Sequence, residues 1–316
     1  MGEAKRPLLV IGGPTASGKT ALSVALARCH GGEVVSADSM QMYRGMDIAT
    51  AKPTPGERAG VPHHLLDILD PGQSFSVAEF ASLARPVIDG IQSRGALPVL
   101  AGGTGLYISA IVDNLQFSPT AGDPALRQEL YGIAQKEGNE ALHRMLEEAD
   151  PQAAAGIHPN NVGRVARALE IWRLTGKTMA QTAQASRTVP SPYRACVIAL
   201  DFRDREELYR RIGLRVDRML ADGLVEEARA LLGAGLSSTA AQAIGYKELA
   251  RYFSGEETLE EAVERIKRET RHYAKRQLTW FRKVAGVRWL YVDDYPDGGG
   301  LLAAAEETAR QAGLFV

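Results

Sequence analysis

A loop with the sequence Gly13-Pro14-Thr15-Ala16-Ser17-Gly18-Lys19-Thr20 joins an apolar run, residues 8–11, to a helix-like run, residues 21–29. It matches the phosphate-loop pattern G-x-x-x-x-G-K-[ST] in the order strand, loop, helix that the pattern requires. In this order the backbone N–H groups of the loop and the positive end of the helix form a cradle for an anion. The lysine then neutralises an outer phosphate, and the hydroxyl of Thr20 can hold Mg²⁺. We therefore expect a di- or triphosphate to bind at residues 13–20.

Strand-like and helix-like segments alternate on both sides of a long irregular stretch, residues 39–62, that we interpret as a functional loop. This alternation predicts an α/β fold with a P-loop NTPase-like parallel sheet flanked by helices. Ligands of such sheets collect at the carboxyl ends of the strands, where the phosphate loop, Asp38 and Gly102-Gly103-Thr104-Gly105 would meet. We expect strands at residues 33–37, 64–69 and 96–101, and a helix that begins at the capping box Ser76-Val77-Ala78-Glu79 and runs to residue 92.

The pattern becomes helical at residues 118–192, which we interpret as an inserted helical subdomain. An apolar run at residues 196–201 indicates a return to the sheet. Helical runs at residues 205–232 and 257–284 and a last strand at residues 288–292 follow. The catalytic core would then comprise residues 1–117 and 193–316.

Bulk composition places the chain among ordinary globular proteins. Its 316 residues are 45% hydrophobic and 24% charged, and the net charge of −1 gives no overall attraction to nucleic acid or membrane. The two cysteines, Cys29 and Cys196, have no metal-ligand spacing, which favours a reducing compartment. We find no signal peptide and no apolar run near the ~20 residues that span a bilayer. We expect a cytoplasmic protein, with a monomer as the simplest oligomeric state.

Asp38 follows the second expected strand and lies beside the phosphate loop. A carboxylate there can cap a turn, bind Mg²⁺ through water, or act as a general base. The strand at residues 97–101 ends in Gly-Gly-Thr-Gly, without the acidic residue that a Walker B strand would place on the metal. This absence disfavours an ATPase or a switch GTPase.

Two helical runs carry basic residues. Arg211, Arg215 and Arg218 share one helix face, which is either solvated surface or a source of an arginine for the phosphate site. Between Glu264 and Arg288 there are nine basic residues against two acidic ones, a local charge of +7, with His272, Tyr273, Trp280 and Phe281 interleaved. A salt-bridged surface helix is one interpretation, but the excess of one sign and the aromatic residues favour RNA.

Adjacent histidines, His63 and His64, point in different directions on a strand, and no third ligand has clear spacing. We therefore assign no zinc.

Several blocks together resemble the tRNA dimethylallyltransferase family, also called tRNA isopentenyltransferases. They occur in the family's order across nearly the whole chain, and several are long and particular. Besides the phosphate loop they are Asp38-Ser39-Met40-Gln41, Pro62-His63-His64-Leu65, Gly102-Gly103-Thr104-Gly105-Leu106-Tyr107, Ala243-Ile244-Gly245-Tyr246-Lys247-Glu248 and Lys275-Arg276-Gln277-Leu278-Thr279-Trp280-Phe281-Arg282.

The resemblance implies transfer of a dimethylallyl group from dimethylallyl diphosphate to the exocyclic amine of the adenosine 3′ of a tRNA anticodon. Gly13, Pro14, Thr15, Ala16, Ser17, Gly18, Lys19 and Thr20 would hold the departing diphosphate with Mg²⁺. Asp38 would accept a proton from the amine. Arg215 would add a diphosphate contact, and Thr104 a polar contact to the nucleotide.

The implied tRNA contacts extend further. An adenine in an anticodon loop must be extruded before it reacts. The inserted subdomain would grip the anticodon stem-loop through Asn161-Val162-Gly163-Arg164-Val165, with Arg127 as a further candidate. The blocks that begin at Asp38, Ala243 and Lys275 would also contact tRNA.

Three alternatives stay open. A P-loop small-molecule kinase would share the phosphate loop and the helical insert. An adenylate isopentenyltransferase acting on free nucleotide would not need the basic, aromatic helix. A nucleotide-driven RNA-binding switch is disfavoured by the missing Walker B acid.

Overall fold

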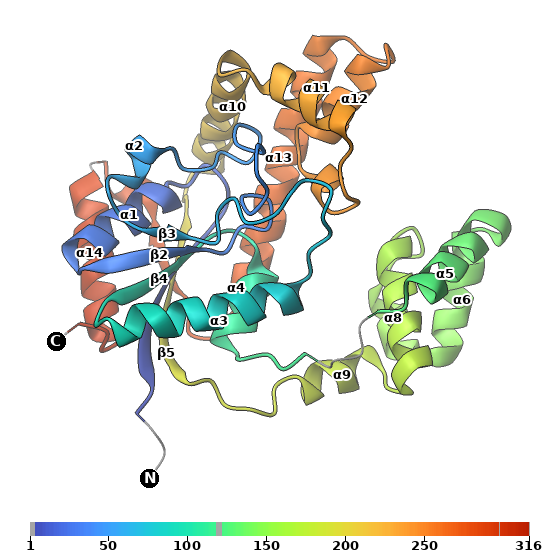
Figure 1. The fold of residues 1–316 in the computed structure, drawn as a ribbon, viewed down its shortest axis with the longest axis horizontal. Helices are drawn as coiled ribbons and strands as arrows, with labels where there is room; N and C mark the ends of the chain where they lie inside the picture. Colours follow the sequence, from blue (N-terminus) through green and yellow to red (C-terminus); the bar gives the residue numbers. More distant parts are fainter. Residues whose placement is uncertain (1–3, 118–121, 297, 316) are drawn as a thin grey trace. The chain divides into compact units, whose positions relative to one another are not determined.

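The computed structural model describes residues 4–117, 122–296 and 298–315. Its centre is a six-stranded parallel sheet with strand order β3-β2-β4-β1-β5-β6 (Figure 1). The strands are β1 (Arg6–Gly12), β2 (Gly32–Ser36), β3 (His63–His64), β4 (Leu97–Ala101), β5 (Tyr193–Asp201) and β6 (Arg288–Tyr291). The predicted α/β fold class is confirmed.

Helices cover both faces of the sheet because its central strands carry continuous apolar runs, such as residues 8–11 of β1 and 196–200 of β5. Alternate residues of β1 point to opposite faces, and Leu9 and Ile11 belong to a core cluster that includes residues of α1 (Lys19–Cys29) and α14 (Gly298–Gln311). The other face of the sheet packs against α3 (Val77–Ser93), which in turn contacts α4 (Gly105–Val112). Each fully buried Leu or Ile contributes roughly 1.5–3 kcal/mol to folding.

Four further helices extend from the end of the sheet at which the strands terminate: α10 (Arg205–Ala221), α11 (Leu224–Ala234), α12 (Tyr246–Phe253) and α13 (Leu259–Phe281) (Figure 1). A small apolar cluster that includes Phe202, Ile212 and Leu278 joins α10 to α13. The helical run expected at residues 205–232 consists of two helices. Gly223, with a φ of 99°, separates α10 from α11, since the left-handed backbone cannot continue a helix.

A second compact unit, Asp113–Pro190, is helical, whereas Met1–Val112 and Ser191–Val316 together form the first unit. The sequence interpretation placed this insert at residues 118–192, and its first four residues lie outside the described structure. Leu142, Leu146 and Val165 are fully buried members of its own core. The helices are α5 (Pro124–Glu137), α6 (Asn139–Ala149), α7 (Pro151–Gly156), α8 (Val162–Thr175) and α9 (Met179–Ala185).

The edge strand is shorter than expected. A strand was predicted at residues 64–69, but β3 ends at His64, and Leu65 and Asp67 have left-handed φ values of 62° and 55°. The turn lets the Asp67 carboxylate approach the Lys52 ammonium to 2.5 Å. The Lys52 side chain is only 4% exposed, and a buried ammonium requires such partners. The apolar composition of residues 64–69 predicts a strand and gives no sign that the buried Lys52 requires Asp67 as its partner.

Candidate active site

The phosphate loop turns from β1 into α1 through three residues with positive φ. Gly13 has a φ of 132°, Ala16 of 64° and Gly18 of 89°. A Cβ on Gly13 would lie 2.6 Å from the carbonyl oxygen of Leu200, so only glycine fits there. The Ser17 hydroxyl donates to the carbonyl of Pro14 at 2.8 Å, and the Lys19 ammonium donates to the same oxygen at 2.5 Å. The loop is therefore held in shape by its own polar groups.

Lys19 lies in a strongly perturbed environment. Burial lowers the pKa of its ammonium to about 7, and the charge of Arg215 lowers it further, whereas the Asp38 carboxylate opposes both effects. Burial also lowers the pKa of Arg215, and the charge of Asp38 again acts in the opposite direction. Two cations that partly repel each other around one carboxylate form a site that favours an added anion.

Asp38 follows β2 at the carboxyl end of the sheet, as expected from the sequence. Its Oδ1 accepts a hydrogen bond from the Met40 backbone at 3.0 Å, so one oxygen has a turn-capping role. The next residue, Ser39, donates its N–H to the Thr104 hydroxyl at 3.0 Å. This bond joins the turn after β2 to the turn after β4.

Tyr273 of α13 is hydrogen-bonded to Thr104 and is affected by the charge of Asp38. Burial and the charge of Asp38 raise the pKa of its phenol, whereas its hydrogen bond with Thr104 acts in the opposite direction. The structure thus brings Lys19, Asp38, Thr104 and Arg215 within mutual electrostatic or hydrogen-bonding range, and adds Tyr273.

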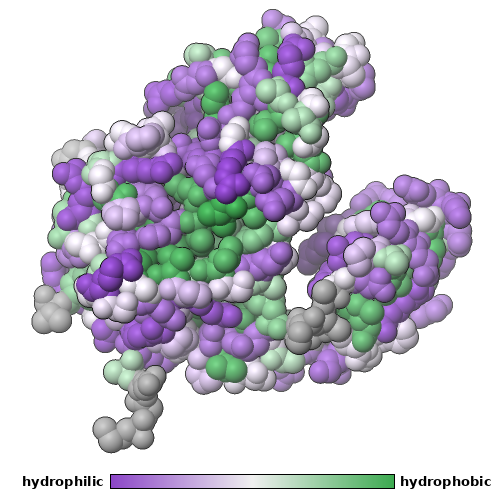
Figure 2. Space-filling view, in the orientation of Figure 1, coloured by the Kyte–Doolittle hydropathy of each residue, from purple (hydrophilic) through white to green (hydrophobic). Residues whose placement is uncertain are grey.

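A cavity of about 1400 Å³ opens beside these residues. The phosphate loop from Thr15 to Thr20, Asp38 and residues 47–54 line it, together with residues of α10 and α13. Arg211, Arg215 and Arg218 all border it, and Arg211 donates its Nε to the Ala16 carbonyl at 3.1 Å. Figure 2 shows hydrophobic residues gathered at the centre of the viewed face of this unit and a mixture of hydrophilic and hydrophobic residues over α10 to α12. The arginine face is therefore part of a built site and not merely solvated surface.

Gln277 of α13 connects the basic helix to the phosphate loop. Its side-chain oxygen accepts from the Thr15 N–H at 2.9 Å, and its amide donates to the Gly103 carbonyl at 3.1 Å. Gln277, Leu278 and Phe281 are buried, so within the block from Lys275 to Arg282 their side chains face the core. The exposed members are Lys275, Arg276, Thr279 and Arg282, whereas Trp280 is half-buried.

The block from Ala243 to Glu248 also points largely inward. Ala243, Tyr246 and Glu248 are buried, and Glu248 accepts the Gly245 N–H at 2.7 Å to cap α12. Lys247 and Ile244 line the cavity. Ala243 also borders the cavity, so half of this block lines the site and the buried Tyr246 and Glu248 pack behind it.

The residues predicted in the insert belong to the unit Asp113–Pro190. Asn161 caps α8 by accepting the Arg164 N–H at 3.4 Å. Arg127 and Arg167 both pair with Glu170, whose side chain is fully buried. Arg127 thus has a structural partner within the unit.

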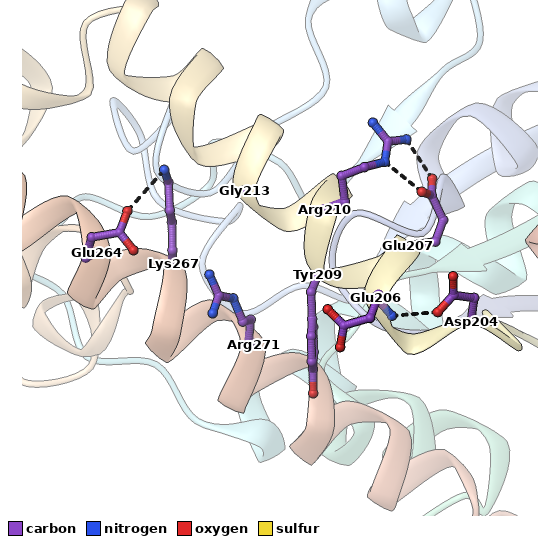
Figure 3. A pocket seen from close by; sticks show the side chains of 9 residues that line it. All are labelled: Asp204, Glu206, Glu207, Tyr209, Arg210, Gly213, Glu264, Lys267 and Arg271. Atoms are coloured by element: carbon purple, nitrogen blue, oxygen red, sulfur yellow. Dashed lines mark hydrogen bonds and ion pairs between the residues drawn. The ribbon is translucent and has the colours of Figure 1, made fainter.

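A second hollow, of about 560 Å³, lies between α10 and α13 (Figure 3). Arg210 pairs with Glu207, and Lys267 pairs with Glu264. Neither the phosphate loop nor Asp38 borders it, so it is not the candidate site.

Among the described residues, no group of three or more His, Cys, Asp or Glu side chains is placed to hold a metal ion. Thr20 borders the cavity. Within the same described ranges, no helix is long and apolar enough to cross a membrane.

Comparison with known proteins identifies the family. The family model for IPP transferase matches residues 41–284, and that for isopentenyl transferase matches residues 7–68. A tRNA dimethylallyltransferase from Geobacillus kaustophilus is 53% identical over 304 residues, which cover 95% of this chain and 94% of the relative. The chain belongs to the tRNA dimethylallyltransferase family. Another tRNA dimethylallyltransferase, from Acetivibrio thermocellus, is 47% identical and covers 98% of this chain and 99% of its own.

Solved structures agree with this membership. The tRNA isopentenylpyrophosphate transferase from Bacillus halodurans has a TM-score of 0.73 at 47% identity, with 98% of both chains covered. A eukaryotic dimethylallyltransferase acting on tRNA has a TM-score of 0.79 at 28% identity, with 97% of this chain and 80% of that chain covered. The family suggested by the sequence blocks is confirmed.

Sequence reasoning singled out Arg211 as part of an arginine face, but it missed two other contributions to this site. Arg211 donates to the Ala16 carbonyl of the phosphate loop. Tyr273 is hydrogen-bonded to Thr104 and is affected by the charge of Asp38, and Glu227 accepts the backbone N–H groups of the cavity-lining residues Asp47 to Ala49. Tyr273 had a signal, as an aromatic residue in the basic stretch. A glutamate in the first turn of a helix usually interacts with the helix dipole. The position of Glu227 in α11 therefore gave no sequence signal of a contact with a distant loop.

Proposed function

We propose that this protein transfers a dimethylallyl group from dimethylallyl diphosphate to the exocyclic amine of the adenosine immediately 3′ of the anticodon in tRNA. The arrangement of Lys19, Arg215 and Asp38 around one cavity carries the proposal. Membership of the tRNA dimethylallyltransferase family supports it. The products are N6-isopentenyladenosine in tRNA and free diphosphate.

The phosphate loop holds the leaving group in this mechanism. Residues 13–20 and Arg215 bind the diphosphate, and Lys19 is protonated as the anion enters. The bond between C1 of the prenyl group and the diphosphate oxygen breaks, and the diphosphate keeps the electron pair. The adenine nitrogen forms a bond to C1 and loses one proton to Asp38. Preorganised donors meet the charge that develops on the leaving group.

Mg²⁺ fits this site as a partner of the diphosphate. Thr20, whose hydroxyl is a hard oxygen ligand of the kind that Mg²⁺ takes, borders the cavity together with Asp38. Mg²⁺ with few protein ligands is usual where phosphate oxygens supply the rest. When bound, it neutralises charge on the departing diphosphate.

The tRNA anticodon stem-loop is the proposed partner. Lys275 and Arg276 on α13 are exposed and available to phosphates. Arg282, the residue after α13, is also exposed but lies 3.7 Å from the Asp201 carboxylate. The insert contributes Asn161 and Arg164, with Val162, Gly163 and Val165 shaping the same helix start. Thr104, hydrogen-bonded beside Asp38, offers a polar contact to the extruded nucleotide. We further propose that the protein acts as a monomer in the cytoplasm.

Incubation with unmodified tRNA and labelled dimethylallyl diphosphate tests the reaction. Label in tRNA is the expected result. Label on free adenine nucleotides alone would favour the nucleotide-specific reaction, and phosphorylation of a metabolite by ATP would favour a kinase.

Asp38→Asn tests the base, because the amide preserves the shape and the acceptor for Met40. We expect turnover to fall roughly 10²- to 10⁴-fold with tRNA binding nearly intact. An equal loss of turnover and binding would contradict the role of Asp38 as base.

A further inference from the structure

Three consecutive backbone N–H groups of the loop after β2 converge on the carboxylate of Glu227. The N–H groups of Asp47 and Ile48 each lie 2.8 Å from Oε2, and that of Ala49 lies 3.0 Å from Oε1. Successive N–H groups of this kind form a concave anion site. Glu227 is separated from this segment by about 180 residues in sequence, so the contact exists only in the folded chain.

Tyr246 completes the surroundings of this carboxylate. Its hydroxyl donates to Oε1 of Glu227 at 2.8 Å, and its side chain is fully buried. Burial and the charge of Glu227 raise the pKa of the phenol, so it remains a donor. No described Lys, Arg or His forms an ion pair with Glu227 in the structure, so its charge is held by four hydrogen bonds and by the N-terminal turn of α11.

The tethered segment forms a wall of the cavity, since every residue from Asp47 to Thr54 borders it. On its inner side the carbonyls of Thr50 and Ala51 each accept from Nε2 of Gln41 at 3.2 Å. The Gln41 oxygen accepts from the Ser36 hydroxyl at 3.3 Å, and the Ser36 oxygen accepts from the Asp38 N–H at 3.4 Å. An unbroken chain of polar contacts and covalent backbone thus runs from Glu227 to Asp38.

We propose that Glu227, supported by Tyr246, is a positioning residue that fixes the cavity wall at residues 47–51 and through it the placement of Asp38. The inference rests on the proposed function, because it assigns to Asp38 the proton transfer that this placement serves. Tyr246 belongs to the block from Ala243 to Glu248, so the proposal assigns a residue of that block a supporting role in the cavity wall and not a contact with tRNA.

A separate anchor keeps the rest of the loop in place when Glu227 is changed. The Lys52 ammonium donates to the Tyr43 carbonyl at 2.7 Å and pairs with Asp47 and Asp67, each at 2.5 Å. The phosphate loop is held independently by Ser17 and Gln277. Loss of the Glu227 contacts should therefore loosen the wall without releasing the diphosphate site.

The test compares Glu227→Gln with Glu226→Gln in the full chain. Both variants remove one negative charge from the same helical turn, but Glu226 is exposed and has no hydrogen bond or ion pair in the described structure. Tyr246→Phe removes a single contact to the same carboxylate. Hydrogen exchange of the peptide covering residues 46–52 reports the wall directly, and kcat, KM for dimethylallyl diphosphate and affinity for inorganic diphosphate report the site.

For Glu227→Gln we expect exchange at residues 46–52 to quicken roughly ten- to hundredfold, because charge-assisted hydrogen bonds are lost. We expect kcat to fall about tenfold or more, with diphosphate affinity and KM within about twofold of the parent. Tyr246→Phe should show a smaller effect of the same kind, and Glu226→Gln none.

Unchanged exchange at residues 46–52, or faster exchange with unchanged kcat, would overturn the proposal. Exchange that quickens equally throughout the protein would reduce Glu227 to a folding role and also overturn it. Failure of the proposed function would show itself separately, because the parent protein would then transfer no prenyl group to tRNA. The exchange measurement would still decide whether Glu227 holds the segment at residues 47–51 in place.

Discussion

Diphosphate binding should weaken as the pH rises above 7. In the free site Lys19 loses its proton above this pH, and the protein must take the proton up again when diphosphate binds. The pKa of Lys19 is lowered from an ordinary 10.5 to about 7 by burial and by Arg215, with Asp38 opposing. The difference corresponds to roughly 5 kcal/mol of unfavourable free energy for the charged form in the free site. A bound diphosphate supplies the missing negative charge and returns the pKa towards its ordinary value. Binding above pH 7 therefore requires uptake of a proton.

The sign follows from this difference between the free and bound states. Below pH 7 the ammonium is already charged, so affinity changes little with Lys19 protonation. Between about pH 7 and the higher pKa of the complex, affinity should fall by about tenfold for each pH unit. The free protein should also gain stability over this range, because its unfolded state binds more protons than the folded state.

Calorimetric titration with inorganic diphosphate from pH 7 to 9, in buffers of different ionisation enthalpy, measures both affinity and proton uptake. Lys19→Met corrects for the titration of diphosphate itself. The parent should take up about one proton more than the variant above pH 8. Equal proton uptake by the two proteins, or affinity that rises with pH only in the parent, would refute the reasoning.

Three further predictions concern Gln277, Glu170 and the basic helix. Gln277→Ala leaves the Thr15 N–H and the Gly103 carbonyl without their partner, so we expect a loss of roughly 1–3 kcal/mol in stability together with weaker diphosphate binding. Unchanged thermal unfolding and unchanged affinity would contradict this role of Gln277. Burial by itself raises the pKa of Glu170, but Arg167 and Arg127 together hold this pKa below its ordinary value. The ionised Glu170 should therefore stabilise the folded protein above the unfolded-state pKa, and this contribution should be lost as the pH falls through the folded-state pKa. Urea unfolding should show Glu170→Gln less stable than the parent by about 1–3 kcal/mol at pH 7, with the gap closing in acid; a gap independent of pH would exclude the ion pairs as its cause. Replacing the exposed Lys275 and Arg276 by Ala should weaken tRNA binding and lower the salt slope by roughly one for each lost phosphate contact, whereas an unchanged slope would place the RNA elsewhere.

Local patterns explain why much of the fold was predictable. The phosphate loop is a contiguous stretch whose glycines and lysine act within eight residues, so its chemistry is readable before folding. Asp38 was located because it follows a short apolar strand, and parallel strands bring their carboxyl ends to one edge. The break at Gly223 and the short β3 were not predicted, because a left-handed backbone and a buried lysine outweigh periodicity there.

Contacts between distant segments account for the rest of the site. Gln277 looks from the sequence like one polar residue of a basic helix, yet it is joined to Thr15 across 262 positions. Glu227 looks like an ordinary first-turn glutamate, but it binds the backbone of a loop about 180 residues away. Backbone N–H groups carry no residue signature, so such partners cannot be read from side-chain types.

The sequence by itself determined the phosphate loop, the parallel α/β sheet and the family, since each depends on the order and spacing of neighbouring residues. Only the tertiary structure decided which side chains face the cavity and which hold its walls. Burial and hydrogen-bond partners depend on packing between helices α10 to α13 and the turns that follow β1, β2 and β4, and no local pattern specifies that packing.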